Sequence, residues 1–281
     1  IIISHYIKEN RGDNDPDFYF GNLPEKLIKE GVSVALVLIN HTRQSNNSVA
    51  SYKNNSYPTI ILSDILPTME EELILNRVKL NAKSIRAMKG LLIDNNNIEY
   101  EVIKNSVYES TSRGARANLR REMQIKRIVT MLKPDSIIMT WEGHAWERVV
   151  MSAARSAKED INCIGYQHAA LFENQHSIFK NLGYPYDPDF LLCSGGSTAR
   201  MFQELGNLPK RKISILGSCR KIKSTTKRQE NQTYNILVIP EGIYEECLLM
   251  FRFVLEASKK YSHMKFTLRL HPIVQKSQIL K

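Results

Sequence analysis

Short apolar runs rich in β-branched residues alternate with longer segments of helical periodicity along most of this chain. Residues 1–3 and 32–39 are runs of the first kind, and residues 20–30 between them have a helical spacing that Gly31 closes. Runs that are apolar throughout are typical of strands buried on both faces of a sheet. Strand, helix and strand in this order predict the opening of a parallel α/β domain.

The same alternation continues to residue 216. The Asn- and Ser-rich residues 40–57 are expected to form a loop, and the helix 114–132 is expected to bury Leu119, Met123, Ile128 and Leu132 as one stripe. The further predicted strands are 57–62, 136–141, 163–168, 190–194 and 212–216, and the further predicted helices are 69–88, 145–158 and 197–205.

Residues 220–233 are polar, charged and without periodicity, which is typical of a linker. We therefore predict two α/β domains with parallel sheets, residues 1–219 and residues 234–281. In the second, a strand at 235–239, a helix at 244–261 and a strand at 265–270 make a single βαβ unit. A lone unit cannot cover its sheet, so we expect this domain to be truncated or completed by another segment.

The chain carries a formal net charge of +10, concentrated in residues 113–127 and 210–227. Neither stretch interleaves aromatic residues, as a nucleic-acid platform would, so phosphate-bearing ligands or lipid head groups are the expected partners. The four cysteines are widely spaced and no apolar run is long enough to span a bilayer. We expect a cytoplasmic protein that makes peripheral contact with the anionic inner face of the cytoplasmic membrane.

Four predicted strand ends are followed by unusual polar residues, at 141–144, 167–168, 240–242 and 271–272. In open parallel sheets, ligands bind outside the carboxyl ends of the strands. Two of these ends belong to each predicted domain, so a cleft between the domains would bring them face to face. This repeated placement predicts a binding site more strongly than any single motif does.

Glu142 is the first candidate for catalysis. It follows a buried strand and precedes Gly143, which permits a sharp turn, so its carboxylate would be partly desolvated and suited to act as a general base for a sugar hydroxyl. The alternative is a structural role, as an N-cap or as an ion-pair partner of Arg148. We expect His144 and Arg148 to support the acceptor, and Glu147 to face away from Glu142.

His168 is the second catalytic candidate, because it ends the predicted strand 163–168 next to Gln167. Both side chains offer hydrogen-bond donors to a phosphate or carboxylate, and Gln167 is expected to support the acceptor. A purely structural, hydrogen-bonded histidine is the alternative.

In the second domain, strand alternation places Arg269 and His271 on one face, where they would clamp a phosphate, and Pro272 would fix the exit turn. The alternative is that Arg269 and His271 are simply solvated residues of an edge strand. Glu241 and Gly242 would open a helix toward an anion, with Glu241 on a ribose hydroxyl. Gly217 and Ser218, after the strand 212–216, are also assigned to donor binding.

No Asp-x-Asp pair stands at a strand end, so we predict chemistry without a metal or cofactor.

Glu142-Gly143 and Leu270-His271-Pro272 resemble the paired acidic-Gly and His-Pro motifs of bacterial sialyltransferases and Kdo transferases. The segments 18–21, 141–148 and 165–168 are similar to surface carbohydrate biosynthesis proteins. In those GT-B enzymes the acidic residue acts in catalysis and the histidine binds the phosphate of a CMP-activated sugar. The chain departs from the pattern at Trp141, where sialyltransferases have a second acidic residue, and at Ala169, which replaces a glycine of capsule polymerases.

The resemblance implies a metal-independent glycosyltransferase of lipopolysaccharide or capsule biosynthesis. It would have a GT-B-like fold, with two Rossmann-like domains whose parallel sheets face a cleft: residues 1–219 as the acceptor and catalytic domain, and residues 234–281 as the start of a truncated nucleotide-sugar-binding domain. Its donor would be a nucleotide sugar, with CMP-linked Kdo or another ulosonic acid as the candidate, and its acceptor a surface polysaccharide or a polyprenyl-linked glycan. Two alternatives stay open: a nucleotide-sugar 2-epimerase of the same fold, and a basic module that binds polyanions without catalysis.

Overall fold

A computed structural model describes residues 1–7, 16–41, 57–89, 98–172, 176–205, 212–219, 234–271 and 274. The chain forms two compact units, Ile1–Lys221 and Ile222–Lys281. The contact boundary falls within the predicted linker 220–233, but the linker itself lies outside the described residues. The assignment of an acceptor domain and a donor domain to residues 1–219 and 234–281 stays a prediction.

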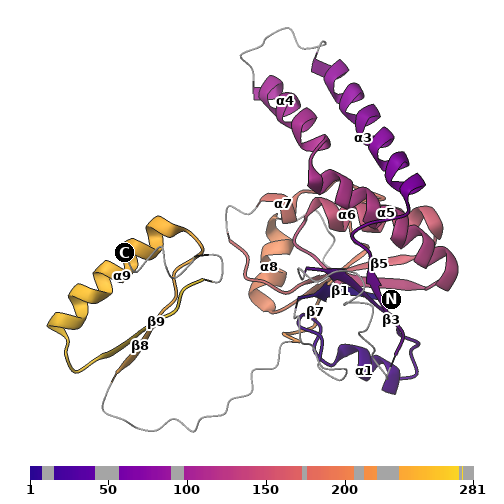
Figure 1. The fold of residues 1–281 in the computed structure, drawn as a ribbon. Coiled ribbons are helices and arrows are strands. Elements are labelled where there is room, and N and C mark those ends of the chain that lie inside the picture. The colour runs from indigo at the N-terminus through magenta and orange to yellow at the C-terminus, as the bar shows by residue number, and fades with distance from the viewer. Residues whose placement is uncertain are drawn as a thin grey trace. The chain divides into compact units, whose positions relative to one another are not determined.

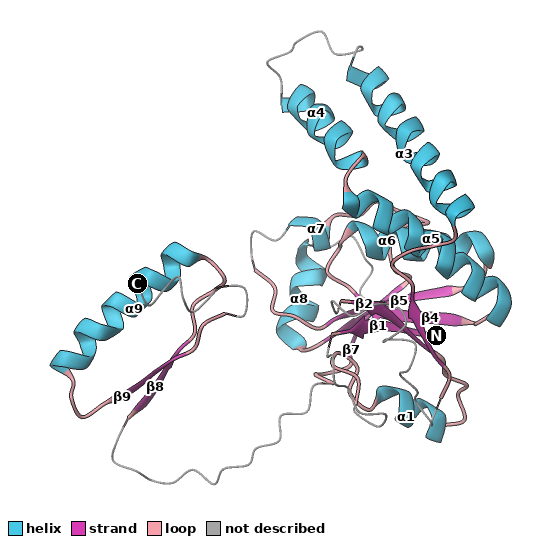
Figure 2. Cartoon of the chain, in the orientation of Figure 1, coloured by secondary structure: helices cyan, strands magenta, loops and turns pink. Residues whose placement is uncertain are grey.

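The first unit is built on a seven-stranded, all-parallel sheet in the order β3-β2-β1-β4-β5-β6-β7 (Figures 1 and 2). This confirms the predicted α/β class. The order grows outward in both directions from β1 and β4, which pair with each other, so the topological switch point lies between these two strands. The strands are β1 Ile2–Tyr6, β2 Leu36–Asn40, β3 Thr59–Leu62, β4 Ser136–Thr140, β5 Asn162–Gln167, β6 Phe190–Cys193 and β7 Ile213–Ile215.

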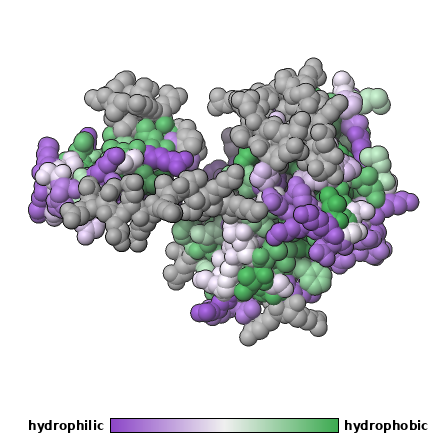
Figure 3. All heavy atoms as spheres, turned by 90° about the horizontal axis from the view of Figure 1, so that it is seen from below, coloured by the Kyte–Doolittle hydropathy of each residue, from purple (hydrophilic) through white to green (hydrophobic). Residues whose placement is uncertain are grey.

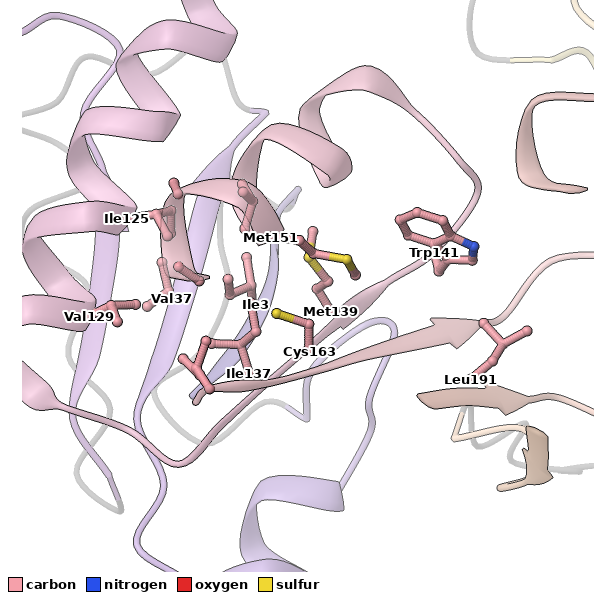
Figure 4. Close-up of a cluster of buried hydrophobic side chains, with 14 of the residues drawn as sticks. Ile3, Val37, Ile125, Val129, Ile137, Met139, Trp141, Met151, Cys163 and Leu191 are labelled. Carbon is pink, nitrogen blue, oxygen red and sulfur yellow. The ribbon is translucent and has the colours of Figure 1, made fainter. Parts of the chain in front are cut away.

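Both faces of the sheet are buried, because alternate residues of each strand point to opposite sides. Ile3, Val37 and Met139 join a large cluster with the helices of one face, seen in Figure 4 together with Ile125 and Met151. Ile2, Leu36, Leu38 and Tyr166 pack on the other side with Phe20 and the partly buried Leu23 and Leu27 of helix α1, Leu23–Lys29. Burial on both faces explains why the strands are apolar throughout.

Helices α5 (Arg113–Leu132) and α6 (Ala145–Ala157) pack against each other over the first of these faces. In α5 the buried residues are Leu119, Ile125, Ile128 and Val129, so the predicted stripe is correct at Leu119 and Ile128. It is wrong at Leu132, which is 44% exposed. The reason is that α5 has two contact surfaces: Ile125 and Val129 face the sheet, whereas Leu119 and the partly buried Met123 face helix α3.

Helices α3 (Thr68–Lys89) and α4 (Ile98–Ser110) lie side by side and project from the rest of the unit (Figure 1). The predicted segment 69–88 corresponds to α3. The sequence pattern did not predict α4, since it has no buried residue and therefore no clear apolar stripe. The remaining helices of the unit are the short α7, His176–Phe179, and α8, Gly196–Leu205.

The second unit contains β8 (Asn235–Val238), α9 (Tyr244–Lys260) and β9 (Lys265–Leu268), with the two strands paired in parallel. This is the predicted βαβ unit, and Val238, Phe251 and Val254 form its small core. The predicted strand 265–270 is too long: β9 ends at Leu268, so Arg269 and His271 follow the strand and do not share its pleated face. Seen from below, hydrophobic and hydrophilic residues are interspersed over the surface of both units (Figure 3).

Candidate functional site

A cavity of about 300 Å³ lies at the carboxyl ends of β1, β2, β4 and β5 in the first unit. It therefore spans the switch point between β1 and β4, which is where ligands bind in open parallel α/β sheets. Its lining is rich in imidazoles and carboxyl groups, from His5, Ile7, Tyr19, His41, Thr140, Glu142, His144, Trp146, Glu147 and His168. Three of the predicted site residues, Glu142, His144 and His168, are among them.

The turn between β4 and α6 places Glu142 in this cavity. Gly143 has a φ of 77°, and a Cβ atom there would collide with the backbone of Ser177 and Ile178, so only glycine fits. Glu147, in the first turn of α6, accepts the backbone N–H groups of Glu142 at 3.0 Å and of His144 at 2.8 Å. The buried Glu147 thus anchors the turn, and Glu142 remains the carboxylate that is accessible from the cavity.

Burial raises the pKa of Glu147 to about 8. The negative charge of Glu142 raises this pKa further, whereas the backbone N–H groups that Glu147 accepts lower it by less than burial raises it. At neutral pH Glu147 is therefore largely protonated, and its role is to hold the turn.

Glu142 lies between two imidazoles. Its Oε2 is 2.9 Å from Nε2 of His144, and its Oε1 is 3.5 Å from Nε2 of His168. The carboxylate side chain is 30% exposed, and that of His168 only 7%. The expected alternative, an ion pair with Arg148, does not form. The geometry brings the two predicted catalytic residues together in one cavity, with a carboxylate and an imidazole able to exchange a proton.

Tyr19 completes this side of the cavity. Its ring meets that of His168 edge-on, with the ring centroids 4.6 Å apart. The position of Tyr19 is fixed by Asp17, whose Oδ1 accepts the hydroxyl of Ser4 at 2.8 Å and the backbone N–H of Tyr19 at 2.9 Å. The end of β1 and the segment before α1 thus contribute to the site together with β4 and β5.

His5 and His41 form a second group of imidazoles that the sequence interpretation missed. Nδ1 of His5 is 2.7 Å from Nε2 of His41, and Nε2 of His5 is 3.4 Å from the hydroxyl of Thr140. Burial is the main reason that the pKa of His5 falls to about 3, and the positive charges of its neighbours add to the effect. Burial also lowers the pKa of His41. Both rings are therefore neutral at physiological pH.

Arg121 extends from α5 toward this second group. Its guanidinium carbon lies 6.0 Å from the ring centroid of Trp146, and Nη1 donates to Oδ1 of Asn118 at 2.9 Å. Its charge lowers the pKa of both His5 and His41, which places it within electrostatic reach of the cavity. The sequence pattern assigned no individual role to this arginine, which lies in the basic stretch 113–127.

Arg148 and Gln167 do not line the cavity. The buried Arg148 forms an ion pair with Asp187, donates to the carbonyls of Ser177 and Lys180 at 3.0 and 2.7 Å, and lies over the ring of Trp141. Gln167 is fully buried, donates to the carbonyl of Ala169 and accepts the hydroxyl of Ser194 at 3.2 Å. Both side chains therefore hold the surrounding loops in place, and neither is positioned to contact an acceptor in the cavity.

Gly217 and Ser218 follow β7, outside the cavity lining. Gly217 has a φ of 85°, and its carbonyl accepts the hydroxyl of Tyr166 at 3.0 Å. In the second unit, a Cβ atom on Gly242 would lie 3.0 Å from Nδ1 of His271, so these two predicted donor residues are neighbours. Glu241 and Arg269 are exposed, and Pro272 lies outside the described residues. Donor binding at these positions stays a prediction.

Within the described ranges, no group of three or more His, Cys, Asp or Glu side chains has an arrangement that could hold a metal ion. Among the described helices, none combines the length and the apolar character needed to cross a membrane.

No protein-family model and no curated protein matches the sequence. Among solved structures, the chain is similar to the UDP-N-acetylglucosamine 2-epimerase of Rickettsia bellii, with a TM-score of 0.47 and 12% identity over 99% of this chain and 63% of that one. The corresponding enzyme of Neisseria meningitidis, bound to UDP-GlcNAc, gives 0.48 and 12% over 99% and 67%. The lipopolysaccharide outer core galactosyltransferase WaaB gives 0.49 and 8% over 99% and 71%.

The chain thus spans 63% of the length of the Rickettsia bellii enzyme. Identities of 8 to 12% do not carry an activity or a ligand over to this chain.

Proposed function

We propose that this chain is part of a GT-B glycosyltransferase whose first unit binds the acceptor sugar in the strand-end cavity. The observation that supports this best is the position of Glu142, between His144 and His168 at the switch point of the sheet. A carboxylate that is reachable from a cavity, hydrogen-bonded to one imidazole and 3.5 Å from a second, is suited to accept a proton from a hydroxyl group. His168 is the second catalytic residue of the proposal.

In the proposed reaction, Glu142 removes the proton from an acceptor hydroxyl while the oxygen of that hydroxyl forms a bond to the anomeric carbon of the donor. The bond from that carbon to the nucleotide phosphate breaks, and the phosphate departs with the electron pair. His271 and Arg269 of the second unit would stabilise the charge that develops on the phosphate. The proposed donor is a nucleotide sugar, with CMP-linked Kdo or another ulosonic acid as the specific candidate.

The decisive experiment replaces Glu142 by Gln in the whole chain and measures sugar transfer from a panel of CMP-, CDP-, UDP- and GDP-linked donors to glycan acceptors. Loss of a general base lowers the turnover rate by roughly 10²- to 10⁴-fold, while donor affinity stays close to that of the wild type. The matched control is Glu122→Gln, since Glu122 lies on α5 and forms an ion pair with Arg77. Near-normal transfer by Glu142→Gln would show that the catalytic assignment is wrong.

Epimerisation of a nucleotide sugar is the second candidate, because a carboxylate beside imidazoles also provides the acid and base that inversion at a sugar carbon needs. Incubation with a nucleotide sugar and no acceptor separates the two functions. An epimerised nucleotide sugar would identify an epimerase, whereas slow hydrolysis or no reaction is the result expected of a transferase. Salt-sensitive binding of heparin that is unchanged in Glu142→Gln, with no turnover of any donor, would instead indicate the non-catalytic module.

A further inference from the structure

The strand-end cavity has two chemically different sides. On one side Glu142 lies between His144 and His168. On the other side the neutral rings of His5 and His41 lie near the guanidinium of Arg121, and no carboxylate is hydrogen-bonded to either ring among the described residues. A general base needs only the first side. The second side therefore has a role that the proposed proton transfer does not explain.

The charge of Arg121 differs from that of its neighbours on α5. Arg120 forms a two-pronged ion pair with Glu71, with N–O distances of 2.6 and 2.7 Å, and Arg127 forms an ion pair with Glu70 at 2.7 Å. Arg121 is half-buried, and within the described part of the chain it forms no ion pair within 4.0 Å. A guanidinium that is partly removed from water and lacks a close carboxylate creates a positive potential around it.

The surrounding groups show that this potential extends into the cavity. Burial is the largest cause that lowers the pKa of His5, and the guanidinium of Arg121 on α5 and the neighbouring imidazoles of His41, His168 and His144 act in the same direction. Asp64, after β3, acts in the opposite direction on His41 and Arg121, but it is exposed and already accepts the side-chain N–H of Asn40 at 3.2 Å. The cavity thus disfavours a further proton at His5, and the part of this effect that comes from the charge of Arg121 favours an anion.

We propose that the side formed by His5, His41 and Arg121 binds a phosphate group, so that the acceptor of this enzyme is a phosphorylated sugar. This inference rests on the proposed function, because it makes the cavity the acceptor site. His5 at the end of β1 and His41 after β2 line the cavity, and Arg121 reaches it from α5 beside Trp146, which also lines it, so the three side chains come from different elements. Donors from several directions suit the tetrahedral oxygens of phosphate better than the two coplanar oxygens of a carboxylate.

The size of the cavity agrees with this substrate class. A volume of about 300 Å³ lies at the lower end of the range for small-molecule sites, which suits one phosphorylated sugar residue and excludes a long glycan from the interior. With the phosphate on the Arg121 side, the sugar ring would extend toward Glu142, where its hydroxyl would lose a proton. The phosphate thereby orients the acceptor for transfer.

The experiment measures binding of inorganic phosphate to the whole chain by titration calorimetry and by thermal shift, without any sugar donor. Arg121→Gln should weaken phosphate binding about 10- to 100-fold, since a hydrogen bond to a charged group contributes about 1.5 to 3 kcal/mol. Arg127→Gln is the matched control on the same helix and should bind phosphate like the wild type. His41→Gln tests the site by a second variant if Arg121→Gln does not fold.

Equal phosphate affinity in the wild type, Arg121→Gln and His41→Gln would overturn the proposal. Glucuronate is the comparison ligand: if it binds to the Arg121 side and phosphate does not, the substrate class is wrong. Sulfate, whose charge does not change in this range, should bind more tightly at about pH 5.5 than at about pH 8, because a bound anion raises the pKa of His5 and His41. Sulfate affinity that is independent of pH would contradict the contribution of the imidazoles.

Glu142→Gln separates this proposal from the proposed function. That variant should keep phosphate binding, because the anion lies on the other side of the cavity. Loss of turnover in Glu142→Gln with no phosphate binding in the wild type would leave the transferase standing and remove the phosphorylated acceptor. Phosphate binding that depends on Arg121, together with full turnover in Glu142→Gln, would keep the anion site and remove the catalytic assignment.

Discussion

At the scale of single residues, Glu142 and Glu147 show how one helix start gives two carboxyl groups different roles. Glu142 faces the cavity, whereas Glu147 is fully buried and accepts backbone N–H groups from Glu142 and His144. Burial dominates the environment of Glu147 and raises its pKa from 4.5 to about 8. The folded state therefore holds a proton on Glu147 that the unfolded chain releases near pH 4.5.

This difference predicts the pH dependence of stability. A raised pKa in the folded state means that the contribution of Glu147 is most favourable below the unfolded pKa and is lost as pH rises toward about 8. Thermal unfolding followed from about pH 5 to about pH 8 should show a falling Tm for the wild type. Glu147→Gln, which cannot ionise, should have a lower Tm at pH 5 because it loses one acceptor oxygen, and a flatter dependence on pH. Parallel curves for the two proteins would contradict this reading of Glu147.

The residues that the sequence interpretation found or missed differ in a physical way. Glu142 was predicted because it directly follows an apolar strand, and His168 because it ends the next predicted strand, and the structure places both in one cavity. His5 was missed because the first strand was predicted to end at residue 3, although β1 continues to Tyr6 and carries His5 at its carboxyl end. Extending that strand through Ser4 and His5 was the available signal. The sequence contained no such signal for Arg121, because a helical pattern does not show which basic side chain points toward the cavity.

At the scale of elements, the contact between α3 and α5 explains part of the basic stretch 113–127. Arg120 and Arg127 of α5 are matched by Glu71 and Glu70 in the first turn of α3, where carboxylates also suit the helix dipole. These ion pairs account for two of the cations of this stretch, and contact of the stretch with lipid head groups stays a prediction.

The predicted consequence concerns the packing of α3. Arg120 and Glu71 are each 21% exposed at the side chain, and their two-pronged pair lowers the pKa of Glu71. Arg120→Gln should reduce the free energy of unfolding by about 1 kcal/mol, measured by urea denaturation, with a smaller difference at high salt. Arg86→Gln, an exposed position on the same α3 helix, is the control and should change stability little. An equal loss in both variants would show that the ion pair contributes nothing specific.

The helices and strands were predicted well wherever burial produces a regular pattern of apolar residues in the sequence. Strands such as β2 and β4 are apolar because both faces of the sheet are covered, and the positions of α5 and α6 follow from their buried stripes. Helix α4 has no buried residue, so its sequence carries no such pattern. The two contact surfaces of α5 likewise depend on α3, which lies far from it in the sequence, and this is why the predicted stripe was wrong at Leu132.

At the scale of the whole molecule, the two units differ in how much of a fold each contains. The first has a seven-stranded sheet with apolar clusters on both faces and a complete cavity at its strand ends. The second has two paired strands and one helix, and residues such as Leu237 and Leu268 on its strands are 55% and 41% exposed. A sheet of two strands is marginally stable by itself.

This contrast predicts that residues 1–219 fold alone, whereas residues 234–281 do not. The isolated first fragment should unfold cooperatively on heating and should keep the phosphate affinity of the whole chain, because every side chain of the proposed anion site belongs to it. The isolated second fragment should show little helical signal in circular dichroism, since a 17-residue helix packed on two strands buries too little apolar surface to offset its conformational entropy. A first fragment that is unfolded, or folded without phosphate affinity, would mean that the cavity depends on residues beyond 219. A stably folded second fragment would show that two strands and one helix are sufficient for folding here.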